Sequence, residues 1–355
     1  MPSLFDPLQI RGVTLSNRIV VSPMCQYSSE DGMANDWHFV HLGSRAVGGA
    51  SLILTEATAV TADGRISPAD LGLWKDQQIE PLARIFHFIT QQGAVPGMQL
   101  AHAGRKASTS APWLGNLPVD ASQGGWTPIW APSSISLGPD HQLPQALSGA
   151  QIQEIVSAFA ATARRAHAAG ARVIEIHAAH GYLLHEFMSP LSNTRGDTYG
   201  GTFENRTRIV REVVSAIRNV WPEELPLIVR ISGTDWLEGG WTADDSVELA
   251  RMLLPLGVDM LDCSSGGLLP ARIPVGPGYQ VPFAERIRRE TGMPTAAVGM
   301  ITQPEQADQI IRTGQADLVV LARELLRQPY WPLLAAPSLR HDVEWPAQYQ
   351  RAKPR

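Results

Sequence analysis

Short apolar segments alternate with longer segments of helical periodicity along the chain, and eight such pairs follow one another. The apolar segments lack the strict apolar–polar alternation of half-exposed strands, so both of their faces should be buried. The longer segments carry apolar stripes, as in Gly149–Ala169 and in Ala243–Leu256, which follows a Thr242 cap. The predicted strands are Ile19–Ser22, Ser51–Thr55, Val95–Leu100, Arg172–Ile176, Leu227–Arg230, Met260–Asp262, Thr295–Val298 and Leu318–Leu321.

Eight successive strand–helix units favour a closed parallel barrel over an open sheet, so we predict the α/β class and a (β/α)8 TIM barrel. Two strand-like pieces within Pro7–Arg18 predict an N-terminal β-hairpin that closes the bottom of the barrel. Two connections are too long for plain loops: Ala103–Ser148 after the third strand and Gly181–Thr202 after the fourth. Insertions of this length commonly cover a site. Composition shows no internal boundary, so residues 1–355 should form a single domain.

Composition narrows the possible partners and compartments. The chain has 34 acidic and 29 basic residues, a net charge of −5 and no cluster of five basic residues, which argues against nucleic-acid binding. The N-terminus lacks the features of a signal peptide, and no apolar run approaches the roughly 20 residues of a membrane span, so we expect a cytoplasmic protein. Only Cys25 and Cys263 are present, too few for a disulfide scaffold or an iron–sulfur cluster. Any redox chemistry would therefore need a bound organic cofactor.

Two imidazoles and a phenol gather where the fourth predicted strand ends. His177 and His180 could be zinc ligands, but no third ligand is apparent at a neighbouring strand end, and we predict no metal site. Alternatively, the two rings donate hydrogen bonds to a substrate carbonyl oxygen and stabilise the enolate that forms. Tyr182 then stands two residues further on, where it can deliver a proton to the α-carbon as a general acid.

Other candidates lie at the ends of the fifth, seventh and eighth strands. Barrel enzymes commonly bind phosphate at the loops after strands 7 and 8. This chain has Gly299 and Ala322–Arg323 at these places. An arginine can donate hydrogen bonds to two phosphate oxygens at once. The alternative for Arg323 is a surface ion pair. Arg230 ends a buried strand and needs an anionic partner or several acceptors, either a ligand or a structural pair with Asp235 or Glu175.

Four segments, which are spread over nearly the whole chain, together resemble the old yellow enzyme family of FMN-dependent ene-reductases. They are Ser22–Tyr27, Gln99–Lys106, His177–Gly201 and Pro346–Arg351. Cys25, Tyr27 and an arginine near the C-terminus are similar to the YqjM-like and xenobiotic-reductase branch. The resemblance implies non-covalent FMN, NADPH or NADH as reductant, and hydride transfer to electron-poor alkenes by a ping-pong scheme. No GxGxxG fingerprint follows a strand, which agrees with one cavity shared by reductant and substrate.

The resemblance also assigns roles to individual residues. It places Arg230 at the flavin N1–O2 edge and Cys25 on the N5–O4 side, whereas a free cysteine is otherwise a small buried hydrophobe. Tyr27 would donate a further hydrogen bond to the substrate carbonyl oxygen. Alternatively, Tyr27 is an aromatic residue at the rim of the site with a solvated hydroxyl. Ala322 departs from the family's usual glycine. The implied cofactor-binding residues are Ser22, Pro23, Met24, Cys25, Ala57, Gln99, Arg230, Gly299, Ala322 and Arg323, and the implied substrate-binding residues are Tyr27, His177, His180 and Arg351.

The C-terminal segment, about residues 340–355, resembles a finger that reaches a neighbouring protomer's active site, which implies a homodimer or a tetramer. A terminal arginine such as Arg351 is otherwise solvated. Val298 stands where the xenobiotic reductases commonly have an aromatic residue, so substrate preference cannot be copied from them. Two alternatives to an ene-reductase stay open here: a flavin-free barrel lyase or isomerase acting on a phosphorylated substrate, and a flavin redox sensor without turnover.

Overall fold

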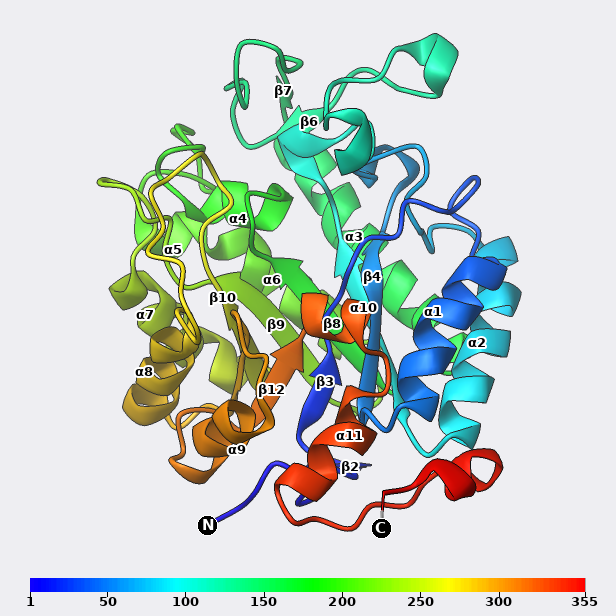
Figure 1. Cartoon of the computed structure of the whole chain (residues 1–355). Helices are drawn as coiled ribbons and strands as arrows, with labels where there is room; N and C mark the ends of the chain where they lie inside the picture. The colour runs from blue at the N-terminus through cyan, green and yellow to red at the C-terminus, as the bar shows by residue number, and fades with distance from the viewer. Residues whose placement is uncertain (355) are drawn as a thin grey trace.

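The computed structural model describes residues 1–354 and shows a closed barrel of eight parallel strands (Figure 1). Around the barrel the order is β3, β4, β5, β8, β9, β10, β11 and β12, with β12 pairing back onto β3. The predicted (β/α)8 barrel is therefore confirmed. The strands are β3 (Ile19–Val21), β4 (Leu52–Ala59), β5 (Val95–Ala101), β8 (Val173–Ala178), β9 (Leu227–Ser232), β10 (Met260–Ser264), β11 (Thr295–Ala297) and β12 (Leu318–Leu321).

Helices cover the outside of the barrel (Figure 1), and α7 begins at the Thr242 cap that the sequence predicts. Ser148 and Thr242 form capping boxes, in which the side chain accepts the N–H of the third helical residue and that residue's side chain bonds back to the cap. The helices are α1 (Asp36–Val47), α2 (Ile79–Gln91), α3 (Gly149–Ala168), α4 (Leu183–Met188), α5 (Phe203–Arg206), α6 (Arg208–Arg218), α7 (Ala243–Leu253), α8 (Val281–Thr291), α9 (Pro304–Arg312), α10 (Arg323–Arg327) and α11 (Trp331–Ser338).

The barrel has a closed end and an open end. The predicted N-terminal hairpin is present as β1 (Leu8–Ile10) and β2 (Val13–Leu15), which pair antiparallel, and it lies with both termini at the end where the strands begin (Figure 1). The first long insertion contains β6 (Trp130–Ala131) and β7 (Gln145–Ala146) and projects beyond the opposite end, where the strands finish. Chemistry in a barrel of this kind is placed at that second end.

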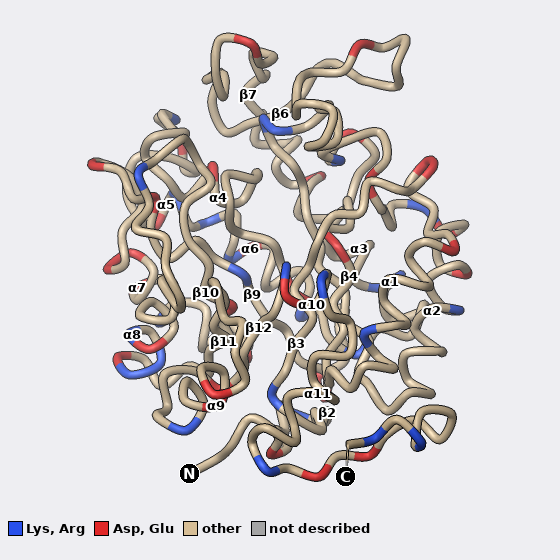
Figure 2. Tube along the Cα trace, viewed as in Figure 1, with Lys and Arg blue, Asp and Glu red and all other residues tan. Residues whose placement is uncertain are grey.

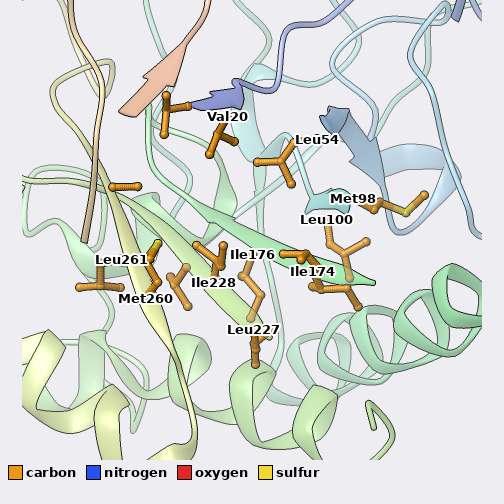
Figure 3. Packing of buried hydrophobic residues seen from close by; sticks show 14 of the residues in the cluster. Val20, Leu54, Met98, Leu100, Ile174, Ile176, Leu227, Ile228, Met260 and Leu261 are labelled. Atoms are coloured by element: carbon orange, nitrogen blue, oxygen red, sulfur yellow. The ribbon is translucent and has the colours of Figure 1, made fainter. Parts of the chain in front are cut away.

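The core explains why the strands read as continuous apolar runs. Every residue of β4, β8, β9 and β10 is buried, because one face packs inside the barrel and the other against the helices. Figure 3 shows such side chains from several strands, among them Ile174, Ile228 and Leu261, filling the space around the sheet. Charged residues are instead distributed over the outer helices and loops with both signs intermixed (Figure 2). Within residues 1–354, no helix is long and apolar enough to cross a membrane.

Candidate active site

The two histidines and the tyrosine of the predicted motif lie together at the end of β8. The ring centroids of His177 and His180 are 5.2 Å apart with an interplanar angle of 84°, and those of His177 and Tyr182 are 4.9 Å apart. His180 and Gly181 both have positive φ, +58° and +70°. This left-handed turn brings the second imidazole back beside the first, which the sequence spacing alone does not show.

Both imidazoles are neutral, since burial and the positive charge of Arg230 hold the pKa of each well below its usual value. His177 Nδ1 accepts the backbone N–H of Ala179 at 3.3 Å, so its proton lies on Nε2. His177 therefore offers an N–H donor from its far ring edge. Among residues 1–354, no group of three or more metal-ligating side chains surrounds this pair.

Ser264, at the end of β10, occupies one edge of the second imidazole. Its Oγ lies 2.6 Å from His180 Nε2 and 3.3 Å from Gln280 Oε1. Because Nε2 is held by this contact, Nδ1 is the ring nitrogen of His180 that is left for a ligand. The backbone N–H of His180 donates to Ser232 Oγ at 2.9 Å, which holds the residue in place.

A half-buried lysine ties Tyr182 and His180 to the loop that follows β5. Lys106 Nζ donates to His180 O at 2.7 Å and lies 5.6 Å from the centroid of the Tyr182 ring. Burial lowers the pKa of Lys106 to about 8, against the opposing charge of Glu186. Burial also raises the pKa of Tyr182 well above its usual value, so its phenol keeps its proton at neutral pH. The sequence reasoning quoted Lys106 only as part of a motif and gave it no role.

Cys25 and Tyr27 lie on the other side of the same space, on the segment that follows β3. Both are half-buried and pack with Tyr182 in a small apolar cluster, and the Tyr27 ring meets Trp113 edge-on at 5.5 Å. Burial and the nearby charges of Asp70 and Glu56 raise the pKa of the Cys25 thiol, so it is a neutral S–H and no thiolate nucleophile. Its sulfur accepts the backbone N–H of Ala57 in β4.

A buried histidine–carboxyl contact that the sequence spacing does not show supports this segment. His38 of α1 and Glu56 of β4 are 3.2 Å apart with both side chains 2 % exposed, and Glu56 accepts the backbone N–H of Gln26 at 3.0 Å. A second buried pair, His185 with Asp235 at 2.9 Å, lies under α4. Both pairs join residues far apart in the chain, so only the folded barrel shows them.

Arg230 has a different partner from the two we considered. Its Nε lies 3.2 Å from Asp262 Oδ2 and its Nη1 donates to Ser22 Oγ at 3.1 Å, whereas Asp235 pairs with His185. The neighbouring strand decides this, because Arg230 of β9 is registered with Asp262 of β10. The protein partner of Arg230 is therefore Asp262, and the predicted pairing with Asp235 or Glu175 is wrong. Gln99, ending β5, donates its amide to Glu175 Oε1 at 2.7 Å.

A cavity of about 230 Å³ opens where β11 and β12 end. Its wall includes Gly299, Ala322 and Arg323 as predicted, together with Val298. Gly299 has φ +122°, and a Cβ there would lie 2.8 Å from Gln280 Nε2, so only glycine fits. Within the described chain, the Arg323 side chain forms no hydrogen bond or ion pair. The surface ion pair that we considered as an alternative role for Arg323 is therefore not seen. Ala322 has φ −104°, which needs no glycine.

This cavity and the polar residues deeper in the barrel fit FMN. Backbone at Gly299 and the unpaired guanidinium of Arg323 suit a phosphate at its outer end. Ser22, Ala57, Gln99 and Arg230 offer donors and acceptors at the strand ends toward Cys25, where a flavin ring would need both. Pro23 and Met24 are half-buried on the connecting segment. The assignment of each residue to the flavin is a proposal based on this placement.

Arg351 is the predicted site residue that lies apart from the others. It is exposed in a 3-10 helix, Ala347–Ala352, at the end of the barrel where the strands begin (Figure 1). The segment 342–344 lines a cavity with Asn17, Gly49 and Gly93, which precede β3, β4 and β5. Arg351 therefore cannot contact the histidine pair of its own chain.

Fold and site together are those of a barrel enzyme with a cavity suited to an anion where β11 and β12 end. The chain belongs to the NADH:flavin oxidoreductase / NADH oxidase family, whose model matches residues 3–341. It is 50% identical to an NADPH dehydrogenase of Geobacillus sp. (strain WCH70) over 350 residues, 98% of each chain. It is 47% identical to an NADPH dehydrogenase of Listeria innocua over 354 residues, 99% of each chain.

Solved structures agree with this assignment. Morphinone reductase in complex with tetrahydroNAD matches with a TM-score of 0.80 and 25% identity, covering 98% of this chain and 93% of that one. An old yellow enzyme homologue from Zymomonas mobilis shares the fold with a TM-score of 0.78 at 24% identity, covering 97% and 94%. The old yellow enzyme resemblance is confirmed, and the protein is an FMN-dependent NAD(P)H oxidoreductase. A flavin-free lyase and a non-catalytic sensor do not agree with these relatives.

Proposed function

We propose that the protein reduces the C=C bond of electron-poor alkenes, such as enones, maleimides and nitroalkenes. One observation carries the proposal: two neutral imidazoles lie 5.2 Å apart beside a protonated phenol, and the Nε2 edge of the second ring is held by Ser264. In this proposal His177 donates from Nε2–H and His180 from Nδ1–H to one substrate oxygen. Donors that strengthen as negative charge develops on an oxygen lower the barrier to enolate formation.

Tyr182 supplies the proton in this scheme. Because burial keeps its pKa high, the phenol gives up its proton only to a strong base, and an enolate α-carbon is one. Lys106, over the Tyr182 ring, stabilises the negative charge that remains on the phenol oxygen. Tyr27 adds a further donor near the carbonyl oxygen. When bound at the strand ends, FMN would supply the hydride-transfer chemistry between NAD(P)H and the β-carbon.

The reductant and the alkene use the same space in turn, which makes the scheme ping-pong. The placement of Arg351 supports a further part of the proposal: its guanidinium completes the site of a second copy in a homodimer or tetramer. Both cysteines are free thiols, which supports the proposed place in the reducing cytoplasm.

An anaerobic two-step experiment tests the proposed reaction. The FMN-loaded protein is bleached with NADPH or NADH, and cyclohexenone is then added while flavin absorbance is followed. We expect bleaching and then rapid reoxidation. In His177→Ala, bleaching should be nearly unchanged, while reoxidation slows by at least tenfold, since one lost donor at an oxyanion costs about 3 kcal/mol.

His87→Ala is the matched control, because His87 is an exposed histidine of α2 far from the site. It should behave as the wild type in both steps. Equal reoxidation rates for His177→Ala and wild type would remove the imidazole from the mechanism. Failure of every activated alkene to reoxidise the bleached protein would exclude ene-reduction itself.

A further inference from the structure

Two carboxyl groups lie next to each other inside the barrel, below the histidine pair. Glu175 of β8 and Asp262 of β10 are each 1 % exposed. Glu175 stands two residues before His177, and Asp262 two residues before Ser264. Side chains two apart on a strand point to the same face, so the carboxyl pair forms the next layer inward from the imidazoles.

The hydrogen bonds of this pair require a proton that a fully ionised pair lacks. Glu175 Oε1 accepts the amide of Gln99 at 2.7 Å. Neither oxygen of Asp262 accepts a hydrogen bond from any N–H or O–H of the described chain, although Arg230 Nε lies 3.2 Å from one of them. Buried carboxylate oxygens are normally bonded. A proton on Glu175 supplies the missing donor, since the Glu175 carboxyl is within hydrogen-bonding reach of Asp262.

The charges around the pair agree with a single shared proton. Arg230 of β9 is the cation that faces it, and Gln99 of β5 and His177 of β8 are neutral there. Strands β3, β11 and β12 contain no ionisable residue, and Glu56 of β4 faces His38. One proton makes the cluster of two carboxyls and one guanidinium neutral overall. Burial, together with the Asp262 charge, raises the pKa of Glu175 to about 8 against the opposing effect of Arg230.

We propose that Glu175 and Asp262 are a proton-sharing pair that takes up a proton when the flavin is reduced and thereby sets the flavin's reduction potential through Arg230. The inference depends on the proposed place of Arg230 at the flavin and not on the proposed alkene substrates. NAD(P)H delivers two electrons and one proton to the flavin as a hydride and leaves as NAD(P)+. At a pH at which the pair is doubly ionised, it then takes one further proton from solvent, and returns it on reoxidation.

The direction of the pH effect follows from this proton count. At a pH below the titration of the Glu175–Asp262 pair, the pair carries its one proton in both redox states of the flavin. It then adds nothing to the pH dependence of the midpoint potential. At a higher pH, reduction requires the uptake of one more proton, so each pH unit disfavours reduction by a further factor of ten. For a two-electron couple this factor equals about 30 mV. We expect the wild-type midpoint potential to acquire this extra slope above about pH 8, until the pair titrates in the reduced protein.

The experiment measures the flavin midpoint potential of the holoprotein between about pH 6 and 10. Glu175→Gln keeps the side-chain shape, can still accept from Gln99 and donate to Asp262, and cannot titrate. Asp262→Asn removes the other carboxyl. Both variants should lose the extra slope while staying near wild type at pH 6. Glu212→Gln, which alters a carboxylate bonded to Tyr199 on the outside of the barrel, should keep it.

Infrared spectroscopy tests the shared proton directly and without turnover. At pH 6 the wild type should show a buried carboxylic-acid carbonyl band that is absent from Glu175→Gln and present in Glu212→Gln. Oxidised wild type should lose this band above about pH 8, and reduction there should restore it. Parallel potential curves for wild type and Glu175→Gln, or a wild-type spectrum without this band, would overturn the proposal. A protein inactive toward alkenes would leave both measurements interpretable.

Discussion

The two ring nitrogens of His180 have different surroundings, and this difference decides what the imidazole can do. Nε2 is held by Ser264 at 2.6 Å, while Nδ1 is left for a ligand. The serine hydroxyl also fixes the orientation of the ring, because it holds one ring nitrogen and leaves the other facing the site. Ser264 is thus a positioning residue that keeps the Nδ1 edge of His180 directed at the substrate.

Ser264→Ala should weaken binding of a para-substituted phenol, whose oxygen resembles the enolate, by about fivefold to tenfold. The reason is the loss of one fixed hydrogen bond, worth about 1 kcal/mol. Flavin absorbance changes on titration with the phenol give the dissociation constant, and 15N NMR of labelled histidine reports the tautomer. Ser265→Ala is the control, because its hydroxyl donates to Gln280 at 2.7 Å. Unchanged phenol binding by Ser264→Ala would refute the positioning role.

Sequence reasoning identified the residues of the site better than their partners. His177, His180 and Tyr182 are close in the chain, and their grouping at a strand end was predictable from the motif. The partner of Arg230 was not, because the register between β9 and β10 places Asp262 opposite it, and register is a property of the closed barrel. The pairing of His38 with Glu56 depends likewise on how α1 packs on β4.

At the scale of elements, the proposed phosphate site lies between β11, β12 and the short helix α10. Two arginines of this region line the same cavity but differ in their partners. Arg327 Nη2 is bound to Glu324 Oε2 at 2.5 Å, whereas Arg323 has no such partner within residues 1–354. The guanidinium of Arg323 is therefore the one available for an anion.

Arg323→Ala should raise the FMN dissociation constant by roughly tenfold to a hundredfold, since a charge-assisted hydrogen bond contributes about 1.5–3 kcal/mol. Fluorescence titration of the apoprotein with FMN gives this constant, and Arg327→Ala should change it far less. Equal effects of the two substitutions would indicate a general charge effect, and full FMN retention by Arg323→Ala would refute the phosphate assignment.

All eight predicted strands form, because each is a short, mainly apolar segment that is buried on both faces. Their ends were less predictable: β8 continues through His177 to Ala178, and β10 continues to Ser264. Polar residues at these positions read as loop in the sequence, yet they lie inside the barrel where they contact one another. The register shift between Leu54 and Ala57 in β4 also has no sequence signature.

At the scale of the whole molecule, a buried acid affects stability. Glu186 of α4 is fully buried, its Oε1 accepts the N–H of Arg105 at 2.9 Å, and its Oε2 lacks a hydrogen-bond partner. Burial raises its pKa to about 8 from the ordinary 4.5. Between these pH values the folded state holds a proton that the unfolded state has lost, so this group lowers stability as pH rises from about 4.5 to 8.

Glu186→Gln should remove this contribution. The free energy of unfolding of the wild type, measured by urea denaturation, should fall relative to the variant by about 1 kcal/mol per pH unit between pH 5 and 8. Above pH 8 the difference should become constant. Parallel curves for the two proteins across this range would show that Glu186 is ionised in the folded protein.

The position of Arg351 makes a prediction about assembly. The end of the barrel that carries the tail is opposite to the end that carries the histidines, so one chain cannot complete its own site with this residue (Figure 1). Tyr349 packs edge-on against Tyr330 at 5.9 Å, and Lys353 Nζ donates to Val343 O at 2.9 Å. The tail is therefore held in place, so the proposed contact of Arg351 with a site requires a second copy of the chain.

Mixed oligomers distinguish a shared site from a self-contained one. His177→Ala and Arg351→Ala should each impair alkene-driven reoxidation, the second by raising the alkene concentration needed for half-maximal rate. In a hybrid of the two variants, the protomer with intact His177 receives the intact Arg351 of its neighbour, so one site of the pair should regain wild-type kinetics. Activity of the coexpressed hybrid, with its mass from light scattering, checks this expectation. If Arg351 acted within its own chain, or did not reach a site at all, the hybrid would show only the average of the two variants.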